Sequence, residues 1–153
     1  MKISADRTQA WLSTLWAGAV LAVGALAAPS LFAVLPAQLA GQGAGQIFAI
    51  EAKVSLAMAI LMFLFERRRV RLAHESGQNA QAMSGELLMI LAALFLTVFG
   101  EFALHPMMEA AKAGQPTRLS FGALHGLSAG LFWIKIVVLL SLSWRLSGRT
   151  AQT

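Results

Sequence analysis

Residues 11–28 read WLSTLWAGAVLAVGALAA, a run of 18 residues without a charged side chain. A helix needs about 20 mostly apolar residues to cross a bilayer, so this run predicts a membrane span. Three similar runs follow, at 46–65, 87–110 and 121–144. None alternates apolar and polar residues as a half-buried strand does. The sequence therefore predicts an all-α, integral membrane four-helix up-down bundle, with residues 1–153 as a single transmembrane domain.

The composition supports this class of protein. Hydrophobic residues make up 58% of the chain and charged residues only 12%, whereas soluble domains average roughly 45–50% and about 25%. The chain has no cysteine, which excludes disulfides, cysteine-ligated zinc and a thiol nucleophile. The net charge of +5 does not indicate a nucleic-acid partner, because the basic residues gather where the apolar runs end. We expect the lipid bilayer as the main partner and no nucleic acid.

The basic residues predict the orientation. Most lie at the two termini or after the second span: Lys2, Arg7, Arg67, Arg68, Arg69, Arg71, Arg145 and Arg149. The opposite connections hold only Lys112 and Arg118. By the positive-inside rule both termini are cytoplasmic, and the loops 29–45 and 111–119 face the periplasm from a bacterial inner membrane. A secretory signal peptide is the alternative interpretation of the first span.

Prolines and glycines predict where helices end. Residues 29–45, PSLFAVLPAQLAGQGAG, contain two prolines and three glycines. We expect a helix to kink or stop there, with the glycines ending one helix and starting the next. Pro106 predicts a kink in the third helix, which then ends at Gly114. Ser84 is the expected N-cap of that helix.

Small and aromatic residues predict contacts with other helices and with the membrane surface. Glycines recur at spacing four on the fourth helix and predict a packing face, within the bundle or against a second copy or another membrane protein: Gly122, Gly126 and Gly130. Tryptophans near the expected cytoplasmic boundary are typical of an aromatic belt: Trp11, Trp16 and Trp144.

Polar side chains within the spans are the candidate site, because a charge at bilayer depth costs at least about 2.5–3.5 kcal/mol. Those near the expected periplasmic face form the candidate binding cluster: Glu51, Lys53, Glu101, His105, Glu109, His125 and Ser128. Glu101, His105 and Glu109 recur at intervals of four and share one helix face. We expect Glu101 to pair with Lys53, and His125 to point toward a neighbouring helix.

Lys135 lies near the middle of the fourth span. Two interpretations of it stay open. It snorkels toward the membrane surface, or it faces the bundle and pairs with a carboxylate.

Three interpretations of the cluster stay open as well. The polar residues hold the helices together. Alternatively, His125 with His105 or a methionine binds copper or haem iron. In the third, Glu101 and the two histidines form a path for protons or a small substrate. The sequence contains no nucleophile elbow and no cofactor fingerprint. We therefore expect a non-enzymatic binding, transport-assisting or scaffold protein, with a haem- or copper-binding protein as the alternative.

Three segments, APSLFAVLPAQLAGQGAGQIF, GEFALHPMMEAAKAG and FGALHGLS, resemble in this order the transmembrane protein 205-like family, long carried as a domain of unknown function. The resemblance covers about residues 16–142. The recurrent pieces of the family that this sequence matches are Ala28-Pro29, Pro106 and His125-Gly126. The resemblance implies a small protein with four membrane helices and no agreed activity. It favours His125 over His105 as a ligand.

Overall fold

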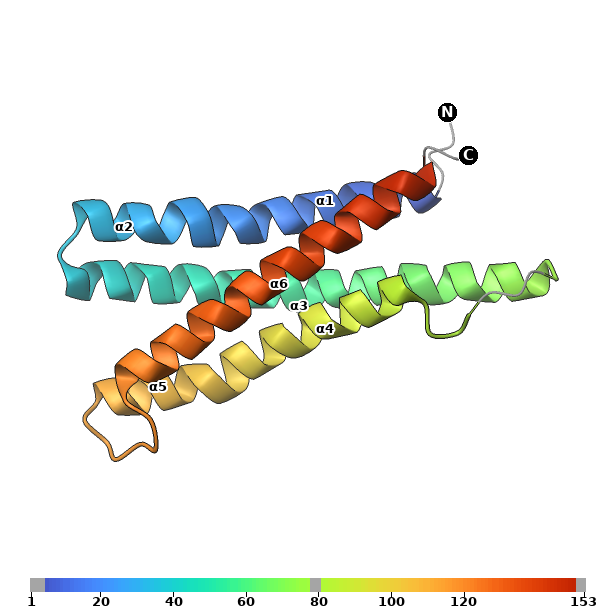
Figure 1. Ribbon diagram of the computed structural model, residues 1–153. Coiled ribbons are helices and arrows are strands. Elements are labelled where there is room, and N and C mark those ends of the chain that lie inside the picture. The colour runs from blue at the N-terminus through green and yellow to red at the C-terminus, as the bar shows by residue number, and fades with distance from the viewer. Residues whose placement is uncertain (1–4, 78–80, 151–153) are drawn as a thin grey trace.

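The computed structural model describes residues 5–77 and 81–150, and in these residues every regular element is helical. The chain forms four helical rods (Figure 1). The first rod consists of α1 (Ala5–Ala22), a π-helical turn η1 (Val23–Ala27) and α2 (Ala28–Val34). The second is α3 (Ala37–Glu75). The third consists of α4 (Gly85–Phe99), a π-helical turn η2 (Gly100–Leu104) and α5 (His105–Lys112), and the fourth is α6 (Phe121–Thr150).

All four rods are long and apolar enough to cross a membrane, so the chain is a multi-pass membrane protein. Successive rods run in opposite directions, and α1 begins at the end of the bundle where α6 ends (Figure 1). α6 crosses the bundle obliquely and packs against α1 and α4, while α3 also contacts both of these helices. The predicted all-α membrane bundle is confirmed.

The first and third rods each accommodate a proline in the same way. Each π-helical turn is followed by one residue and then a proline, Pro29 after η1 and Pro106 after η2. The residue before each proline donates its backbone N–H to a carbonyl five positions earlier, from Ala28 to Val23 and from His105 to Gly100. A π turn absorbs one extra residue within a helix. The rod therefore continues through the proline, although proline supplies no N–H to the helix ladder.

The connection between the first two rods is shorter than the sequence predicts. The helical rod continues through Pro29 to Val34, and the break falls only at Leu35 and Pro36. The glycine-rich piece at 41–45 lies inside α3, so the prediction that its glycines separate two helices is wrong. Gly43 lies against α2, where an added Cβ would contact a methyl group of Leu31 at 3.4 Å.

Two predicted helix ends are confirmed. Ser84 is the N-cap of α4, and its Oγ accepts a hydrogen bond from the backbone N–H of Leu87 at 3.1 Å. Gly114 follows the end of α5 with φ +73°. Gln115 then donates its N–H back to the carbonyl of Ala110 at 3.0 Å, the long reverse bond of a Schellman motif.

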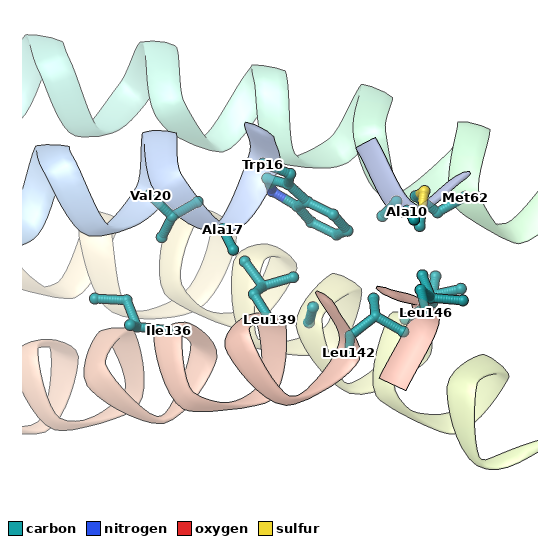
Figure 2. Packing of buried hydrophobic residues seen from close by; sticks show 12 residues of the cluster. Ala10, Trp16, Ala17, Val20, Met62, Ile136, Leu139, Leu142 and Leu146 are labelled. Atoms are coloured by element: carbon teal, nitrogen blue, oxygen red, sulfur yellow. The ribbon is translucent and has the colours of Figure 1, made fainter. Parts of the chain in front are cut away.

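The buried core occupies the half of the bundle that contains the start of α1 and the end of α6. α1 contributes Trp16, Ala17 and Val20, and α6 contributes residues at helical spacing along the face opposite (Figure 2). The α6 residues are Ile136, Leu139, Leu142 and Leu146. Met62 of α3 and Ile90 of α4 complete this core, so all four rods contribute to it.

Candidate functional site

The centre of the bundle holds a buried ion pair between α3 and α6. Nζ of Lys135 donates to both carboxylate oxygens of Glu51, at 2.9 Å each. Both residues are buried, with 8% of Glu51 and 3% of Lys135 exposed. A buried charge in a membrane needs a partner, and each of these two supplies it for the other. Of the two interpretations of Lys135, the pairing with a carboxylate is confirmed and snorkelling is not.

A serine and a tryptophan extend this pair to α1. Ser55 lies one turn after Glu51 on α3, and its hydroxyl donates a short hydrogen bond to the Glu51 carboxylate. Nε1 of Trp16 in turn donates to Oγ of Ser55 at 2.8 Å. Because Trp16 is 2% exposed and bonded inside the bundle, the prediction that it belongs to an interfacial belt is wrong. Trp11 and Trp144, by contrast, are exposed.

One aromatic ring lies against the lysine. Nζ of Lys135 lies 4.8 Å from the ring centroid of Phe132, within the range of a cation–π contact. The ring of Phe132 meets Phe48 of α3 edge to face, with the centroids 5.1 Å apart. Gly24 of η1 makes room for this ring, because a Cβ added at Gly24 would lie 2.5 Å from Cε1 of Phe132. The charge pair thus lies in an apolar, closely packed surrounding.

A pocket of about 310 Å³ opens beside the pair, between α1 with η1 on one side and α3 on the other. Glu51 and Ser55 belong to its lining, but both are buried, and the surface that faces the pocket is almost entirely apolar or aromatic, including Trp16. Ala19, Ile50 and Val54 also line it and are exposed on the outer surface of the bundle. In a membrane this pocket opens toward lipid.

A second buried network ties all four rods together at the end of the bundle where α1 begins. Glu66 of α3 is fully buried and is bound by Arg69 at 2.6 Å and Ser84 at 2.6 Å. Gln9 of α1 and Arg149 of α6 also donate to it, at 3.3 and 3.4 Å. The network continues to the buried carboxylate of Glu86, which receives Arg145 at 3.1 Å and Arg149 at 2.7 Å.

Sequence reasoning missed this network. From the sequence alone, the arginines of this end indicate only an orientation. The available signal was a pair of carboxylates, Glu66 and Glu86, each placed where an apolar run meets a basic connection.

The expected stripe on the third rod forms at the other end of the bundle. Nδ1 of His105 lies 3.5 Å from the carboxylate of Glu101, and Nε2 lies 3.9 Å from that of Glu109. Glu109 also accepts from Lys112 at 2.7 Å. Lys112 in turn lies 5.6 Å from the ring centroid of Phe121, at the start of α6. Each of these ionic side chains is at least partly exposed, unlike Glu51 and Glu66.

The sequence matches the DUF4149 family, a domain of unknown function, over residues 11–116. The chain belongs to this family. No curated protein and no solved structure matches it. The part matched to DUF4149 contains Trp16, Glu51 and Ser55, whereas Lys135 lies beyond it on α6.

The structure divides the expected polar cluster of this DUF4149 protein. Glu51 joins Lys135, whereas Lys53 lies exposed on another face of α3. The predicted pair of Glu101 and Lys53 is not found, because Glu101 lies against His105. His125 is exposed and stacks on Phe121 of its own helix with the ring centroids 5.9 Å apart, so the expectation that it faces a neighbouring helix is wrong. Ser128 is half-buried on the same helix.

The predicted packing glycines of α6 meet no other helix in the described part of the chain. They are exposed, and a Cβ added at any of them would meet no atom within 4 Å: Gly122, Gly126 and Gly130. Contacts between the first rod and α6 use Gly24 instead.

The histidines form no metal centre within the described residues, where no group of three or more histidine or acidic side chains is arranged to hold an ion. Glu101 and Glu109 approach opposite nitrogens of the His105 ring, so one ion cannot lie between all three groups. His125 stacks on Phe121 and forms no ion pair with a described acidic residue. The described histidines and carboxylates therefore do not converge on a single ion.

Proposed function

We propose that this DUF4149 protein is a non-enzymatic binding protein of the bacterial inner membrane, and that the pocket beside Glu51 and Ser55 takes an amphiphilic small molecule from the bilayer. The observation that carries the proposal is the coincidence of a lateral pocket with a buried ion pair. About 310 Å³ lies at the lower end of the range for small-molecule sites. Such sites are mostly apolar with a few polar groups, as this one is.

A role in ligand binding explains the buried ion pair better than a role in stabilising the fold. Replacing a buried ion pair by well-packed apolar residues is often neutral or stabilising, so stability alone gives little reason for the pair. A carboxylate has about four acceptor positions. Glu51 uses three of them, for Lys135 on both oxygens and for Ser55. The fourth has no partner among the described residues, and we propose that a ligand with an amine or hydroxyl group reaches it, while its alkyl chain occupies the apolar pocket.

The orientation is part of the proposal. The distribution of the basic residues supports cytoplasmic termini and periplasmic connections after α2 and α5. The stripe of Glu101, His105 and Glu109 would then lie near the periplasmic face. Its carboxylates are matched by His105 and Lys112 within the chain, which favours a structural role for the stripe. The three segments quoted above support a place in the transmembrane protein 205-like family.

Trp16 provides the test, because it lines the pocket and hydrogen-bonds to Ser55. Replacing Trp11, Trp133 and Trp144 by phenylalanine leaves Trp16 as the single tryptophan, and these three residues are all exposed. In lipid nanodiscs, dodecylamine and dodecanol should change the Trp16 emission in a saturable way. Dodecane should do so more weakly, since it offers no donor to Glu51.

Two variants test whether the saturable change in Trp16 emission comes from a ligand in this pocket. Ala19→Phe should fill the pocket from α1 and abolish the saturable change. Leu15→Phe is the matched control, because Leu15 is exposed on the same helix and does not line the pocket. Equal responses in the two variants, or no saturation with either donor-bearing probe, would refute the proposed function.

A further inference from the structure

A second pocket, of about 490 Å³, lies on the C-terminal part of α3, apart from the pocket beside Glu51. Arg67, Arg68 and Arg71 line it, with Leu64 at one end and Ala82 across the following connection. Residues 64, 67, 68 and 71 follow the helical spacing of a single face. Three guanidinium groups and an apolar side chain therefore share one hollow.

The arginines of this pocket are not held by strong ion pairs in the described residues. Their neighbour Arg69 belongs to the buried network, bound to Glu66 at 2.6 Å. Arg71 meets only Glu75, at 3.9 Å and with both side chains mostly exposed, and such a pair contributes little. Arg67 and Arg68 are exposed and form no ion pair with a described acidic residue. Glu75 also lines the pocket and offsets one of the three charges.

The position of the pocket along α3 matches the membrane surface. α3 has 39 residues and is about 58 Å long at 1.5 Å per residue, whereas the bilayer core is about 30 Å thick. Its C-terminal end extends beyond the other rods (Figure 1). The apolar run of α3 ends at Phe65, and only Glu66 separates it from the arginines. A bilayer core that spans this apolar run would place Leu64 at acyl-chain level and the guanidinium groups at headgroup level.

We propose that this pocket binds the phosphate of an anionic phospholipid headgroup, from the leaflet that this end of the bundle meets. Guanidinium groups bind phosphate oxygens through paired N–H donors, which a lysine cannot reproduce. Leu64 would lie against the first methylene groups of the same lipid. This site is independent of the amphiphile pocket, because it shares no residue with it.

The test is a lipid titration followed by native mass spectrometry of the purified full chain. The wild-type protein should retain phosphatidylglycerol in preference to phosphatidylcholine. Arg67→Gln with Arg68→Gln should lower the affinity for phosphatidylglycerol about 30-fold, from the typical contribution of a basic residue near an anionic surface. Lys53→Gln with Arg118→Gln removes the same charge from exposed sites elsewhere and should leave the affinity within about twofold.

Three results would overturn the proposal. The first is an equal retention of the two lipids by the wild type. The second is an equal loss in the two double variants, which would mean that net charge alone attracts the lipid. The third is displacement of phosphatidylglycerol by an equal concentration of inorganic phosphate, which would assign the pocket to a soluble anion. Thermal unfolding of both variants checks that they remain folded.

Discussion

Lys135 on α6 binds both carboxylate oxygens of Glu51 on α3 at 2.9 Å, although the two residues are 84 positions apart in the sequence. The contact joins the second and fourth rods near the middle of α6, and Ser55 and Trp16 extend it to the first rod. One buried pair therefore fixes the depth and rotation of three helices relative to one another. Glu51 and Ser55 also belong to the lining of the lateral pocket.

Replacing one residue of the Glu51–Lys135 pair should lower the free energy of unfolding more than replacing both residues. Lys135→Met leaves Glu51 buried without a cation, and Glu51→Gln leaves the ammonium without an anion. Each should lower the free energy of unfolding by about 3–5 kcal/mol. The double variant should lie closer to the wild type than either single variant. Unfolding by sodium dodecyl sulfate in mixed micelles gives the free energy of unfolding of the wild type, the two single variants and the double variant.

Lys53→Met is the control for these variants, since it removes a lysine from an exposed position two residues from Glu51. It leaves the buried pair intact and should not lower the free energy of unfolding as Glu51→Gln and Lys135→Met do. If the effects of Glu51→Gln and Lys135→Met simply add in the double variant, the two residues do not act as a pair.

Replacing the buried carboxylate of Glu66 should also destabilise the protein. Glu66→Gln removes the charge that faces Arg69 and Arg149 and also disturbs the bond from Ser84. Because a buried network loses a charged centre, we expect a loss of about 3 kcal/mol in the free energy of unfolding. Glu75→Gln is the same change on the same helix at a side chain that is 62% exposed, and it should have almost no effect. Similar losses in the two variants would contradict the importance of the network.

The sequence predicts the four helices well because the bilayer requires long apolar runs, and such runs are visible without any tertiary knowledge. It could not predict which polar residue faces inward. α3 is apolar around much of its circumference, so periodicity does not separate the face of Glu51 from that of Lys53. The two residues are adjacent in depth but lie on different sides of the helix. The choice depends on where α6 crosses, which no local pattern encodes.

The same limit applies at Pro106 and explains the error at His125. A proline within a span predicts a disturbed helix, but the π-helical turn before Pro106 is one of several ways to accommodate it. His125 follows a phenylalanine at spacing four, and stacking on Phe121 uses a contact within its own helix. Its exposure follows from the rotation of α6, which is fixed by Lys135 and by the leucines further along the helix.

The close approach at Gly24 should not tolerate a methyl group. Gly24→Ala places Cβ 2.5 Å from Phe132, and that ring already meets Lys135 and Phe48. Because overpacking typically costs about 1–3 kcal/mol, we expect a loss of that size in the free energy of unfolding. Gly18→Ala is the control on α1, since a Cβ there meets no atom within 4 Å and alanine favours a helix. A Gly24→Ala protein as stable as Gly18→Ala would contradict the described packing of η1 against α6.

Metal analysis should separate the described geometry from the copper or haem alternative. His105 is bracketed by Glu101 and Glu109 on opposite ring nitrogens, and His125 is stacked on Phe121. We therefore expect detergent-purified protein to show no Soret band and no stoichiometric copper or iron, by visible spectroscopy and by inductively coupled plasma mass spectrometry. Added copper should bind no more tightly to the wild type than to a variant carrying His105→Ala and His125→Ala. His74→Ala, at an exposed position at the other end of the bundle, serves as the control. A Soret band or bound copper that disappears with His125→Ala and persists with His74→Ala would restore the metal interpretation, with the packing at the start of α6 rearranged to supply the missing ligands.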